Sequence, residues 1–267
     1  MWIRKGDWAL VTGSSSGIGK AFAGELAAQG VNLFLVAIEG DQLIELARGW
    51  EAAYHIQTVS LALDLSDPDF RSPISGALEA KGVQIDLVVN AAGFGYFGDF
   101  CSMTHEQIDR MVRVDVIALA GLCRLLLPGM IARKRGAIIN VASIAGCLPY
   151  PYAAVYSAGK SFVRVFTQAL WAENRERGVH ILAVCPGYTQ TNFEKISTEP
   201  STVHLFPGED PVRMAQKTLS RIGRGGPTFF THPTHPFKVI GARLLPLRTF
   251  ASILRRLMGV GQGSARR

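Results

Sequence analysis

Short apolar runs alternate with longer segments of helical period along most of this chain. The runs are rich in Val, Ile and Leu, which is typical of strands buried on both faces of a sheet. They predict strands at WALVT (8–12), NLFLVA (32–37), TVSLAL (58–63), DLVVN (86–90), AIINVA (137–142) and HILAVC (180–185). Helices are predicted between them, near 17–29, 40–53, 67–81, 105–133 and 154–177. Because parallel strands need crossover connections, this alternation predicts an α/β fold, a Rossmann-like doubly wound parallel sheet of six to seven strands with helices on both faces.

The alternation breaks down near residue 188. Residues 188–212 have no clear period, which is typical of a lid or a mobile loop in a compact domain. TFF (228–230) is a candidate edge strand, and the segment KVIGARLLPLRTFASILRRLMG that follows is helical in pattern, with an interruption at Pro246. We therefore expect one domain over residues 1–267, with a lid at about 188–212 and a basic, helical C-terminal extension at about 232–267.

Composition narrows the class of protein. The 267 residues are 48% hydrophobic and 18% charged, which excludes a disordered chain. No uninterrupted apolar run reaches the ~18 residues that a membrane-spanning helix needs. The four cysteines lie far apart and lack the spacing of a zinc site or a disulfide framework, so we expect no metal centre. The opening residues contain no apolar signal core. These features favour a reducing, cytoplasmic location.

The net charge of +7 is unevenly distributed along the chain. Residues 213–267 carry 11 Lys and Arg and no acid, whereas the preceding residues carry more acids than bases. A positive charge confined to the tail does not favour binding of nucleic acid by the whole domain.

A glycine-rich turn follows the first predicted strand. It reads Thr12-Gly13-Ser14-Ser15-Ser16-Gly17-Ile18-Gly19 and leads into a helical pattern. Glycines allow a tight turn, close approach of the backbone to a pyrophosphate and close packing of the helix on the sheet. The N-terminus of the helix then offers free N–H groups to the phosphates. Glycines also close many ordinary turns, but the strand–turn–helix context favours dinucleotide binding.

Several motifs in order along residues 8–192 extend this interpretation. They are the TGxxxGxG turn, Asn90-Ala91-Ala92-Gly93 after the fourth strand, Ser143, a YxxxK pair at Tyr156 and Lys160, and Pro186-Gly187 with Thr191. Together they resemble the single-domain branch of the short-chain dehydrogenase/reductase family. The cofactor-binding residues expected from the turn and the resemblance are Gly13, Ser15, Ser16, Gly17, Ile18, Gly19, Glu39, Asp64, Leu65, Asn90, Ala91, Ala92, Gly93, Tyr156, Lys160, Pro186, Gly187, Thr189 and Thr191.

The same resemblance implies a catalytic triad of Ser143, Tyr156 and Lys160. The spacing of Tyr156 and Lys160 places them one turn apart on one helix face. A phenol has a pKa near 10, and a cation held nearby favours its ionised form. Lys160 is therefore expected to tune Tyr156 and to hold the nicotinamide ribose, while Ser143 orients the substrate oxygen. A YxxxK pair alone is more often a solvated pair on a helix surface.

One position departs from the family pattern. Val114-Asp115-Val116 stands where family members usually carry Asn in a VNV-like context that completes a proton relay. Asp115 keeps the backbone carbonyl of that relay but adds a buried negative charge, which is expected to disturb the balance between Lys160 and Tyr156. We include Asp115 among the catalytic residues.

The choice between NAD and NADP is a question of charge. Glu39 lies 20 residues beyond Gly19, where NAD sites place an acid on the ribose hydroxyls. The usual arginine position of the family corresponds to Ile38, so a 2′-phosphate would meet an acid and no obvious cation. The position that usually carries Asp in members that bind NAD is Ala37 here, and a solvated Glu39 is the simpler alternative. NAD is favoured, with NADP as the alternative.

The predicted substrate site is apolar. By analogy with the family, its walls are expected to include Phe94, Tyr96, Leu148, Tyr150 and Phe193. Such a lining favours a lipophilic secondary alcohol or ketone, of fatty-acyl, steroid-like or aromatic type. We therefore expect an NAD(P)-dependent oxidoreductase acting on CH–OH groups. The alternatives are a dinucleotide-binding regulatory protein with little turnover and a peripheral membrane protein that acts through its basic tail.

The expected partners beyond substrate and cofactor involve the helices. Resemblance to the family implies a homodimer or homotetramer formed through residues 105–133 and 154–177. In the tail, Leu247, Phe250, Leu254 and Met258 recur at helical spacing with arginines mostly off that stripe. This pattern fits either contact with an anionic membrane surface or packing on the protein, and packing is favoured because most short amphipathic helices face a core.

Overall fold

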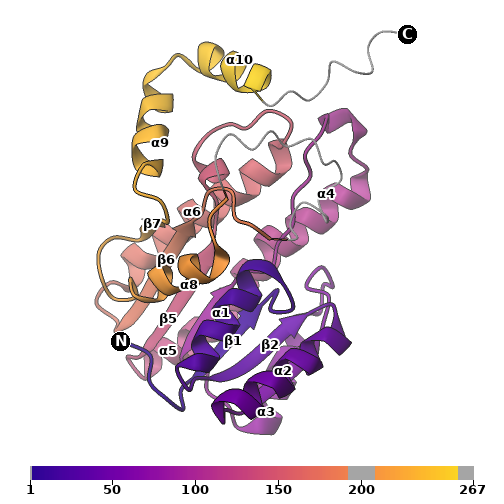
Figure 1. The fold of residues 1–267 in the computed structure, drawn as a ribbon, viewed down its shortest axis with the longest axis vertical. Coiled ribbons are helices and arrows are strands. Elements are labelled where there is room, and N and C mark those ends of the chain that lie inside the picture. The colour runs from indigo at the N-terminus through magenta and orange to yellow at the C-terminus, as the bar shows by residue number, and fades with distance from the viewer. Residues whose placement is uncertain (1, 192–207, 258–267) are drawn as a thin grey trace.

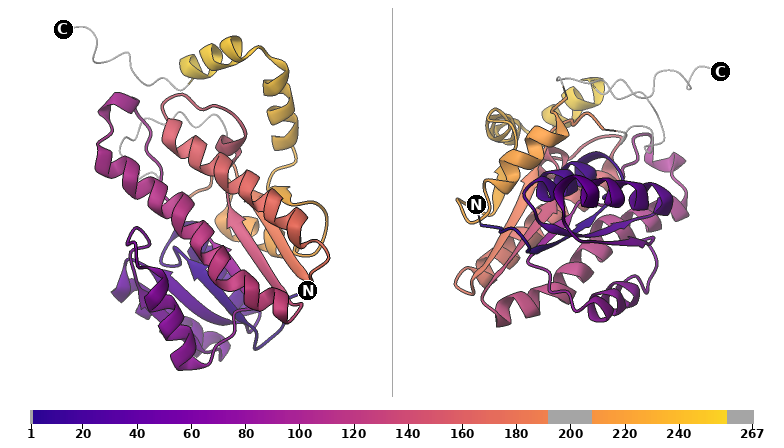
Figure 2. Two further views of the ribbon diagram at one scale, coloured as in Figure 1. Left: turned by 180° about the vertical axis from the view of Figure 1, so that it is seen from behind. Right: turned by 60° about the horizontal axis from the view of Figure 1, so that its bottom comes forward.

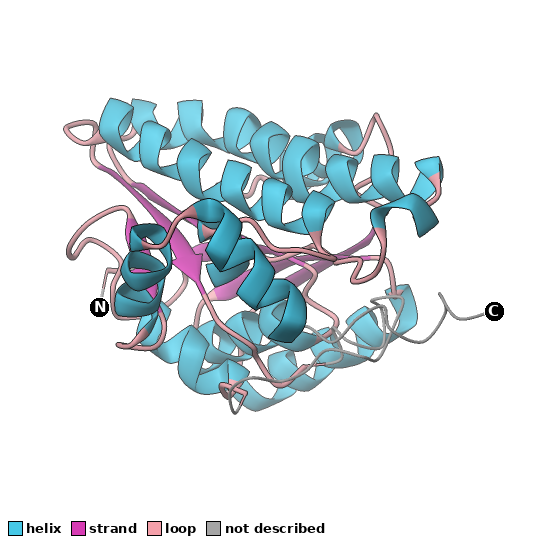
Figure 3. Cartoon of the chain, turned by 90° about the horizontal axis from the view of Figure 1, so that it is seen from above, coloured by secondary structure: helices cyan, strands magenta, loops and turns pink. Residues whose placement is uncertain are grey.

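A seven-stranded parallel sheet forms the middle layer of the molecule (Figures 1 and 3). The computed structural model describes residues 2–191 and 208–257. The strands lie in the order β3-β2-β1-β4-β5-β6-β7. Their bounds are β1 Trp8–Thr12, β2 Asn32–Ala37, β3 Thr58–Ala62, β4 Leu87–Asn90, β5 Gly136–Val141, β6 Val179–Cys185 and β7 Thr228–Phe230. The predicted doubly wound fold is confirmed, including the short edge strand.

Helices cover both faces of this sheet, as the view from above shows (Figure 3). On one face lie α1 (Gly17–Ala28), α2 (Gly40–Tyr54) and α8 (Pro211–Leu219); on the other lie α3 (Arg71–Lys81), α4 (His105–Val112), α5 (Leu119–Ala132) and α6 (Ala154–Asn174). Successive residues of β1 alternate between the two cores: Val11 packs with Phe22 of α1, whereas Leu10 packs with Leu122 of α5. This two-sided burial explains why the strands are continuous apolar runs.

The long helix predicted over 105–133 contains a different turn in its middle. Residues Arg113–Ala118 form a π-helical segment, η2, between α4 and α5. Such wide turns inside α-helices are found frequently at functional sites, because they displace one side chain from the regular helical register. Asp115 lies in this segment and is buried.

This helical stretch is also a candidate membrane span by its length and composition. His105–Ala132 is long and apolar enough to cross a membrane by length and composition, with a mean hydropathy of 1.9 in its best window. Arg124 interrupts the apolar residues of this stretch, so no uninterrupted apolar run reaches that length, as expected. Leu122, Cys123 and Met130 nevertheless pack into the core under the sheet. The stretch behaves as a core helix of a globular domain and is weak evidence for a membrane span.

Several boundaries differ from the predictions for local reasons. Helix α3 begins at Arg71 and not near 67, because Asp67 and Asp69 form side-chain turns before it. Helix α8 was not predicted and follows the irregular segment directly. Asp210 caps it by accepting a hydrogen bond from the Arg213 amide, and Pro211 occupies its first turn. The predicted lid at 188–212 lies mostly outside the described residues.

The C-terminal extension forms two helices, α9 (His235–Leu244) and α10 (Leu247–Leu257), separated at Pro246 as predicted. They project from the end of the sheet where β6 finishes (Figures 1 and 2). Val239 and Leu254 are buried against the rest of the protein, whereas Phe237, Leu244 and Leu247 are exposed. Packing on the domain is therefore only partial.

An ionic cluster joins the amino ends of three neighbouring strands. Arg135, just before β5, lies 2.7 Å from a carboxylate oxygen of Asp86 and 2.6 Å from one of Asp7. Asp86 also accepts a hydrogen bond from the Trp8 amide at 3.1 Å. These contacts raise the pKa of Arg135, mainly through the hydrogen bond to Asp7. The cluster therefore fixes β1, β4 and β5 relative to one another at the end of the sheet opposite the strand termini discussed below.

We predict that Arg135→Met destabilises the fold, because it leaves two largely buried carboxylates without their cation. The expected cost is about 1–3 kcal/mol, discounted for partial exposure of the guanidinium. In a protein of this size that corresponds to a decrease in Tm of about 2–4 °C per kcal/mol, measured by differential scanning calorimetry. Arg124→Met, on the exposed side of α5, is the matched control. Equal Tm values for the two variants would contradict the role of the cluster.

Candidate active site

The candidate site lies at the carboxyl ends of β1, β4, β5 and β6. The chain leaves β1 toward β2 on one side and returns through β4 on the other, so the order of strands reverses between β1 and β4. Crevices at such reversals are where open α/β sheets bind ligands. All the motifs singled out in the sequence follow strands that end at this edge.

The glycine turn after β1 has the close packing that its sequence predicts. Gly13 has a φ of +64°, and a Cβ atom there would lie 2.9 Å from the Cα of Ala92. A Cβ on Gly19 would collide with the carbonyl oxygen of Gly13. The Thr12 hydroxyl accepts hydrogen bonds from the amides of Ala91 and Ala92 at 3.1 and 3.0 Å. The turns after β1 and β4 are thereby held against each other with no room for side chains.

The N-terminus of α1 is open toward this crevice. Ser16 precedes the helix in an extended conformation, and among the described residues no side chain caps the helix or places an acid in its first turn. Its first amides and the positive end of its dipole are therefore available to an anion. A Cβ on Gly17 would lie 3.3 Å from the Thr191 side chain, so the segment after β6 passes over the same turn. A dinucleotide pyrophosphate fits this cradle.

The predicted adenosine end brings Glu39 to the glycine turn. The Ser15 hydroxyl donates a 2.8 Å hydrogen bond to the Glu39 carboxylate, which joins the turn after β2 to the turn after β1. Asp64, after β3, accepts from the amide and hydroxyl of Ser66 and lies 3.5 Å from Arg110 of α4. Burial raises the pKa of Asp64, but the hydrogen bonds from Ser66 and the charge of Arg110 outweigh that effect, so the pKa is lowered overall.

Two predicted cofactor residues have side chains in the core. Leu65 packs among the apolar residues on the α5 side of the sheet. Asn90 donates a 2.8 Å hydrogen bond to Asn140, which in turn donates to Thr167 of α6 at 2.9 Å. Their side chains thus connect β4, β5 and α6, and only their backbone faces the crevice edge.

The structure brings Ser143, Tyr156 and Lys160 together. Ser143 ends the segment after β5 and accepts a hydrogen bond from the Ala145 amide at 3.1 Å, which starts the short helix η3 (Ile144–Cys147). Gly146 of η3 lies directly on the backbone of Lys160, where a Cβ would collide. This close contact places the Ser143 hydroxyl within hydrogen-bonding distance of the Tyr156 phenol. The Lys160 Nζ lies 5.8 Å from the centre of the Tyr156 ring.

All three side chains are buried, and burial affects the Tyr156 phenol. Burial raises the pKa of Tyr156, the hydrogen bond from Ser143 lowers it, and the negative charge of Asp115 raises it further. Without a bound dinucleotide the phenol is therefore protonated at neutral pH. The Lys160 ammonium donates a 3.2 Å hydrogen bond to the Val141 carbonyl.

Asp115 lies beneath this cluster. Its Oδ1 atom is 3.8 Å from the Lys160 Nζ, and a Cβ on Gly93 would collide with it. Within the described part of the chain, neither carboxyl oxygen makes a hydrogen bond of ordinary length to a side chain. Burial raises the pKa of Asp115 to about 6, and the Lys160 charge opposes that shift. The predicted disturbance of the Lys160–Tyr156 pair thus has a geometric basis.

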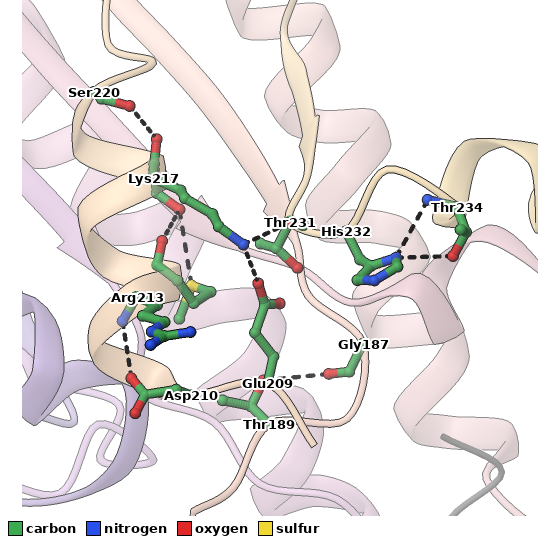
Figure 4. A network of polar contacts seen from close by, with 12 residues as sticks. Gly187, Thr189, Glu209, Asp210, Arg213, Lys217, Ser220, Thr231, His232 and Thr234 are labelled. Carbon is green, nitrogen blue, oxygen red and sulfur yellow. Dashed lines mark hydrogen bonds and ion pairs between the residues drawn. The ribbon is translucent and has the colours of Figure 1, made fainter. Parts of the chain in front are cut away.

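The segment after β6 is held by polar contacts (Figure 4). The Thr189 hydroxyl donates to the Gly187 carbonyl at 3.3 Å, and Thr189 pairs with Glu209. Lys217 of α8 lies 3.1 Å from Glu209 and reaches the Thr231 carbonyl. Helix α8 and the strand β7 therefore fix this side of the crevice, although Phe193 lies outside the described residues.

Aromatic side chains gather around the catalytic phenol. Tyr156 packs in a small apolar cluster with Phe94, Tyr96 and Tyr150, and the Phe97 ring centre lies 5.6 Å from that of Tyr156. Burial raises the pKa of Tyr150. Leu148 is partly exposed on the adjoining loop and is not part of the cluster. Phe94, Tyr96 and Tyr150, three of the residues expected to line the substrate site, thus lie in one cluster with Tyr156.

Two further residues at this edge were not predicted. The His235 ring of α9 packs against Gly187, where a Cβ would lie 2.7 Å from the ring, and burial lowers the pKa of His235 to about 4. Arg110 lies over the Phe94 ring at 5.6 Å as well as near Asp64. No motif marks either residue, because each reaches the crevice from an element distant in sequence.

A glycine cradle at a helix N-terminus, with a Ser-Tyr-Lys cluster at the neighbouring strand ends, defines a dinucleotide-dependent oxidoreductase of the α/β class. The sequence model described as short chain dehydrogenase matches residues 7–201. The chain belongs to this short-chain dehydrogenase/reductase family, and it is an NAD(P)-dependent enzyme acting on CH–OH and ketone groups.

Curated proteins similar in sequence to this chain include reductases of fatty-acyl compounds. The chain is 34% identical to the very-long-chain 3-oxoacyl-CoA reductase of Rattus norvegicus over 81% of its own length and 69% of the relative. It is 35% identical to the reductase of that name from Homo sapiens, over 80% and 69%.

Solved structures share the fold. A short-chain dehydrogenase from Sphingobium yanoikuyae in complex with NADPH is 27% identical, with a TM-score of 0.78 over 97% of this chain and 98% of that one. A 7β-hydroxysteroid dehydrogenase is 23% identical, with a TM-score of 0.84 over 94% and 98%, and shows likeness of fold alone.

We predict that Asp115→Asn changes both pH dependence and stability. A raised carboxyl pKa means that the folded state favours the protonated acid. Its contribution to stability is therefore present below pH 3.8 and lost as pH rises through about 6. The difference in Tm between Asp115→Asn and wild type should increase over that interval. The variant should also lower the pKa of Tyr156, since the ionised carboxylate no longer opposes the phenolate.

Calorimetry at several pH values and a pH profile of kcat/KM for alcohol oxidation measure these two effects. The limb of the profile that rises with pH, which reports ionisation of Tyr156, is expected at lower pH in the variant. Asp109→Asn, exposed one turn and a half earlier on the same helical stretch, is the matched control. A stability difference that does not vary with pH would show that Asp115 has no raised pKa.

Proposed function

We propose that this enzyme reduces long-chain 3-oxoacyl thioesters or related lipophilic ketones. The observation that carries the proposal is the cluster of aromatic side chains, Phe94, Tyr96, Phe97 and Tyr150, that packs with Tyr156. Such a lining desolvates an acyl chain, and Ser143 and Tyr156 offer their hydroxyls to a ketone oxygen. The names of the relatives at 34–35% identity support the same substrate class.

In the proposed reduction, Ser143, Tyr156 and Lys160 each have a separate role. A bound nicotinamide dinucleotide supplies or accepts the hydride. Ser143 holds the ketone oxygen, and Tyr156 donates a proton to it as the alcohol forms. Burial raises the pKa of Tyr156 and so favours the protonated phenol, which suits this reductive direction. Lys160 contributes a positive charge next to Tyr156, and the Val141 carbonyl fixes its ammonium group.

We also propose that NAD is preferred to NADP. Glu39 is hydrogen-bonded to Ser15 of the glycine turn and is thereby held where a ribose would lie. At the position of the family's arginine, Ile38 is exposed and carries no charge. A 2′-phosphate near Glu39 would be repelled, whereas ribose hydroxyls would donate to the carboxylate.

We propose a homodimer or homotetramer in a cytoplasmic setting, formed through α4–α5 and α6. These helices lie side by side on one face of the molecule (Figure 2). Ile117, Phe162 and Val165 are exposed there, at 47%, 38% and 52%. Exposed apolar side chains on adjacent helices are typical of a surface that another subunit covers.

Substitution of Tyr156 tests the reaction. Tyr156→Phe removes the proton donor while keeping the ring, so kcat for reduction of a long-chain 3-oxoacyl-CoA should decrease by about 10²–10⁴-fold. The decrease is measured from the oxidation of NADH or NADPH. Tyr54→Phe, at the exposed end of α2, is the control. Activity of Tyr156→Phe within a factor of about two of wild type would contradict the assignment.

Cofactor preference is tested by titration with NADH and NADPH, followed by nicotinamide fluorescence. NADH is expected to bind about 10-fold more tightly, and Glu39→Ala should remove most of this preference by eliminating the carboxylate. Glu45→Ala, exposed on α2, is the matched control. Tighter binding of NADPH by the wild-type protein would refute the NAD preference and leave the oxidoreductase function intact.

A further inference from the structure

Helix α9 has an apolar stripe that faces solvent. Phe237, Ile240 and Leu244 are 75%, 57% and 80% exposed, and their spacing places them along one side of the helix. Val239, on the opposite side, is buried against the protein. The helix therefore already has a packed inner face, and its outer face is a second, unused apolar surface.

The exposed apolar surface continues beyond α9. Leu245 and Leu247 in the connection to α10, and Ile253 on α10, are exposed as well. We call this surface the C-terminal face; it consists of Phe237, Ile240, Leu244, Leu245, Leu247 and Ile253. This concentration of exposed apolar side chains on two consecutive helices is typical of a surface that a partner covers.

Positive charge surrounds the C-terminal face. Three arginines of α10, Arg248, Arg255 and Arg256, are exposed and lie close in sequence to Leu247 and Ile253. The sequence contains no acid after Asp210. Cations flanking an apolar stripe extend their charged ends toward headgroups while the stripe enters the acyl boundary, which is the arrangement of helices that lie on anionic bilayers.

The charge argues against a second copy of this chain as the occupant. A two-fold contact through the C-terminal face would bring the α10 arginines of two copies together, and neither α9 nor α10 contains an acid to pair with them. An anionic lipid surface neutralises the same cations. Charge complementarity therefore favours an anionic bilayer over a second copy of this chain as the partner of the C-terminal face.

The C-terminal face is fixed to the catalytic end of the molecule. His235 at the start of α9 packs against Gly187, and an Arg243 guanidinium nitrogen lies 3.5 Å from the Cys147 carbonyl of η3. Figure 1 shows α9 and α10 beyond the end of the sheet, on the side where β6 finishes. A surface in contact with the C-terminal face thus lies at the same end of the protein as Ser143 and Tyr156.

We propose that α9 and α10 dock the enzyme on an anionic phospholipid bilayer, with the C-terminal face in the interface and the crevice at the carboxyl ends of the strands turned toward the lipid. The helices lie in the interfacial plane and do not span the bilayer. This inference does not depend on which ketone is reduced.

The test is co-sedimentation of the full-length protein with vesicles of phosphatidylcholine alone and of phosphatidylcholine with phosphatidylserine. Binding to the anionic vesicles and its loss at high ionic strength are expected. Phe237→Asp and Leu244→Asp should each weaken the partition coefficient about 10-fold or more, because each removes an inserted apolar side chain. Arg248→Gln with Arg255→Gln should weaken binding to anionic vesicles by about 5-fold per arginine.

Controls separate this proposal from folding and catalysis. Ile44→Asp replaces an exposed apolar residue of α2, away from the C-terminal helices in Figure 1, and should leave vesicle binding unchanged. Because Phe237 and Leu244 are largely exposed, their variants should keep the wild-type Tm and the wild-type activity on a short, water-soluble ketone. Failure of the ketone assay in every protein would count against the proposed function alone.

Three results would overturn the proposal. The first is absence of binding to anionic vesicles by the full-length protein. The second is binding that Phe237→Asp and Leu244→Asp leave unaltered. The third is a change of molecular mass in light scattering for these variants without a change in vesicle binding, which would identify a second copy of the chain as the occupant.

Discussion

The buried ammonium of Lys160 is the constraint on which the site depends. A charge removed from water must find partners in the fold, and here they are the Val141 carbonyl at the end of β5 and the carboxyl group of Asp115 in the π-helical turn. A Cβ atom on Gly93 would collide with the Asp115 carboxyl group and lie 3.0 Å from the Lys160 Nζ, so this position has no room for a side chain. One buried charge thus connects β5, the turn after β4, the irregular turn of the long helix and α6, and these are the elements that bring Tyr156 and Ser143 together.

Sequence predicted the fold well because strands buried on both faces leave an unambiguous pattern. The run at 32–37 coincides with β2, and the tail helices separate at Pro246 as expected. Helix α8 was missed because a short helix behind an irregular segment has too few turns to show a period, although Asp210-Pro211 is a start signal. The π-helical turn at Asp115 leaves no trace in a helical pattern. The motifs identified which segments meet at the sheet edge, but not the direction of each side chain: Asn90 and Leu65 point into the core.

Residues of the tail reach the crevice in a way that no local motif records. His235 covers Gly187, and Arg243 approaches the turn that begins at Ser143. The C-terminal extension is therefore part of the wall of the site as well as a surface of its own. The effect of an acid at position 115 also depends on distant segments, because Asp115 is buried against Gly93 after β4 and Lys160 of α6. Contacts between distant segments are decided by packing, and their energetic consequences appear only once the chain is folded.

The ionic cluster of Arg135, Asp7 and Asp86 makes the two ends of the sheet unequal in local stability. At the amino ends of the strands, charged hydrogen bonds join three neighbouring strands, whereas the carboxyl ends are connected through turns. Local opening can therefore admit a ligand at one edge while the opposite edge stays closed. In hydrogen-exchange terms, the amides of β1, β4 and β5 near Arg135 belong to the slowest-exchanging, globally unfolding set, and those around the glycine turn exchange through smaller, sub-global openings.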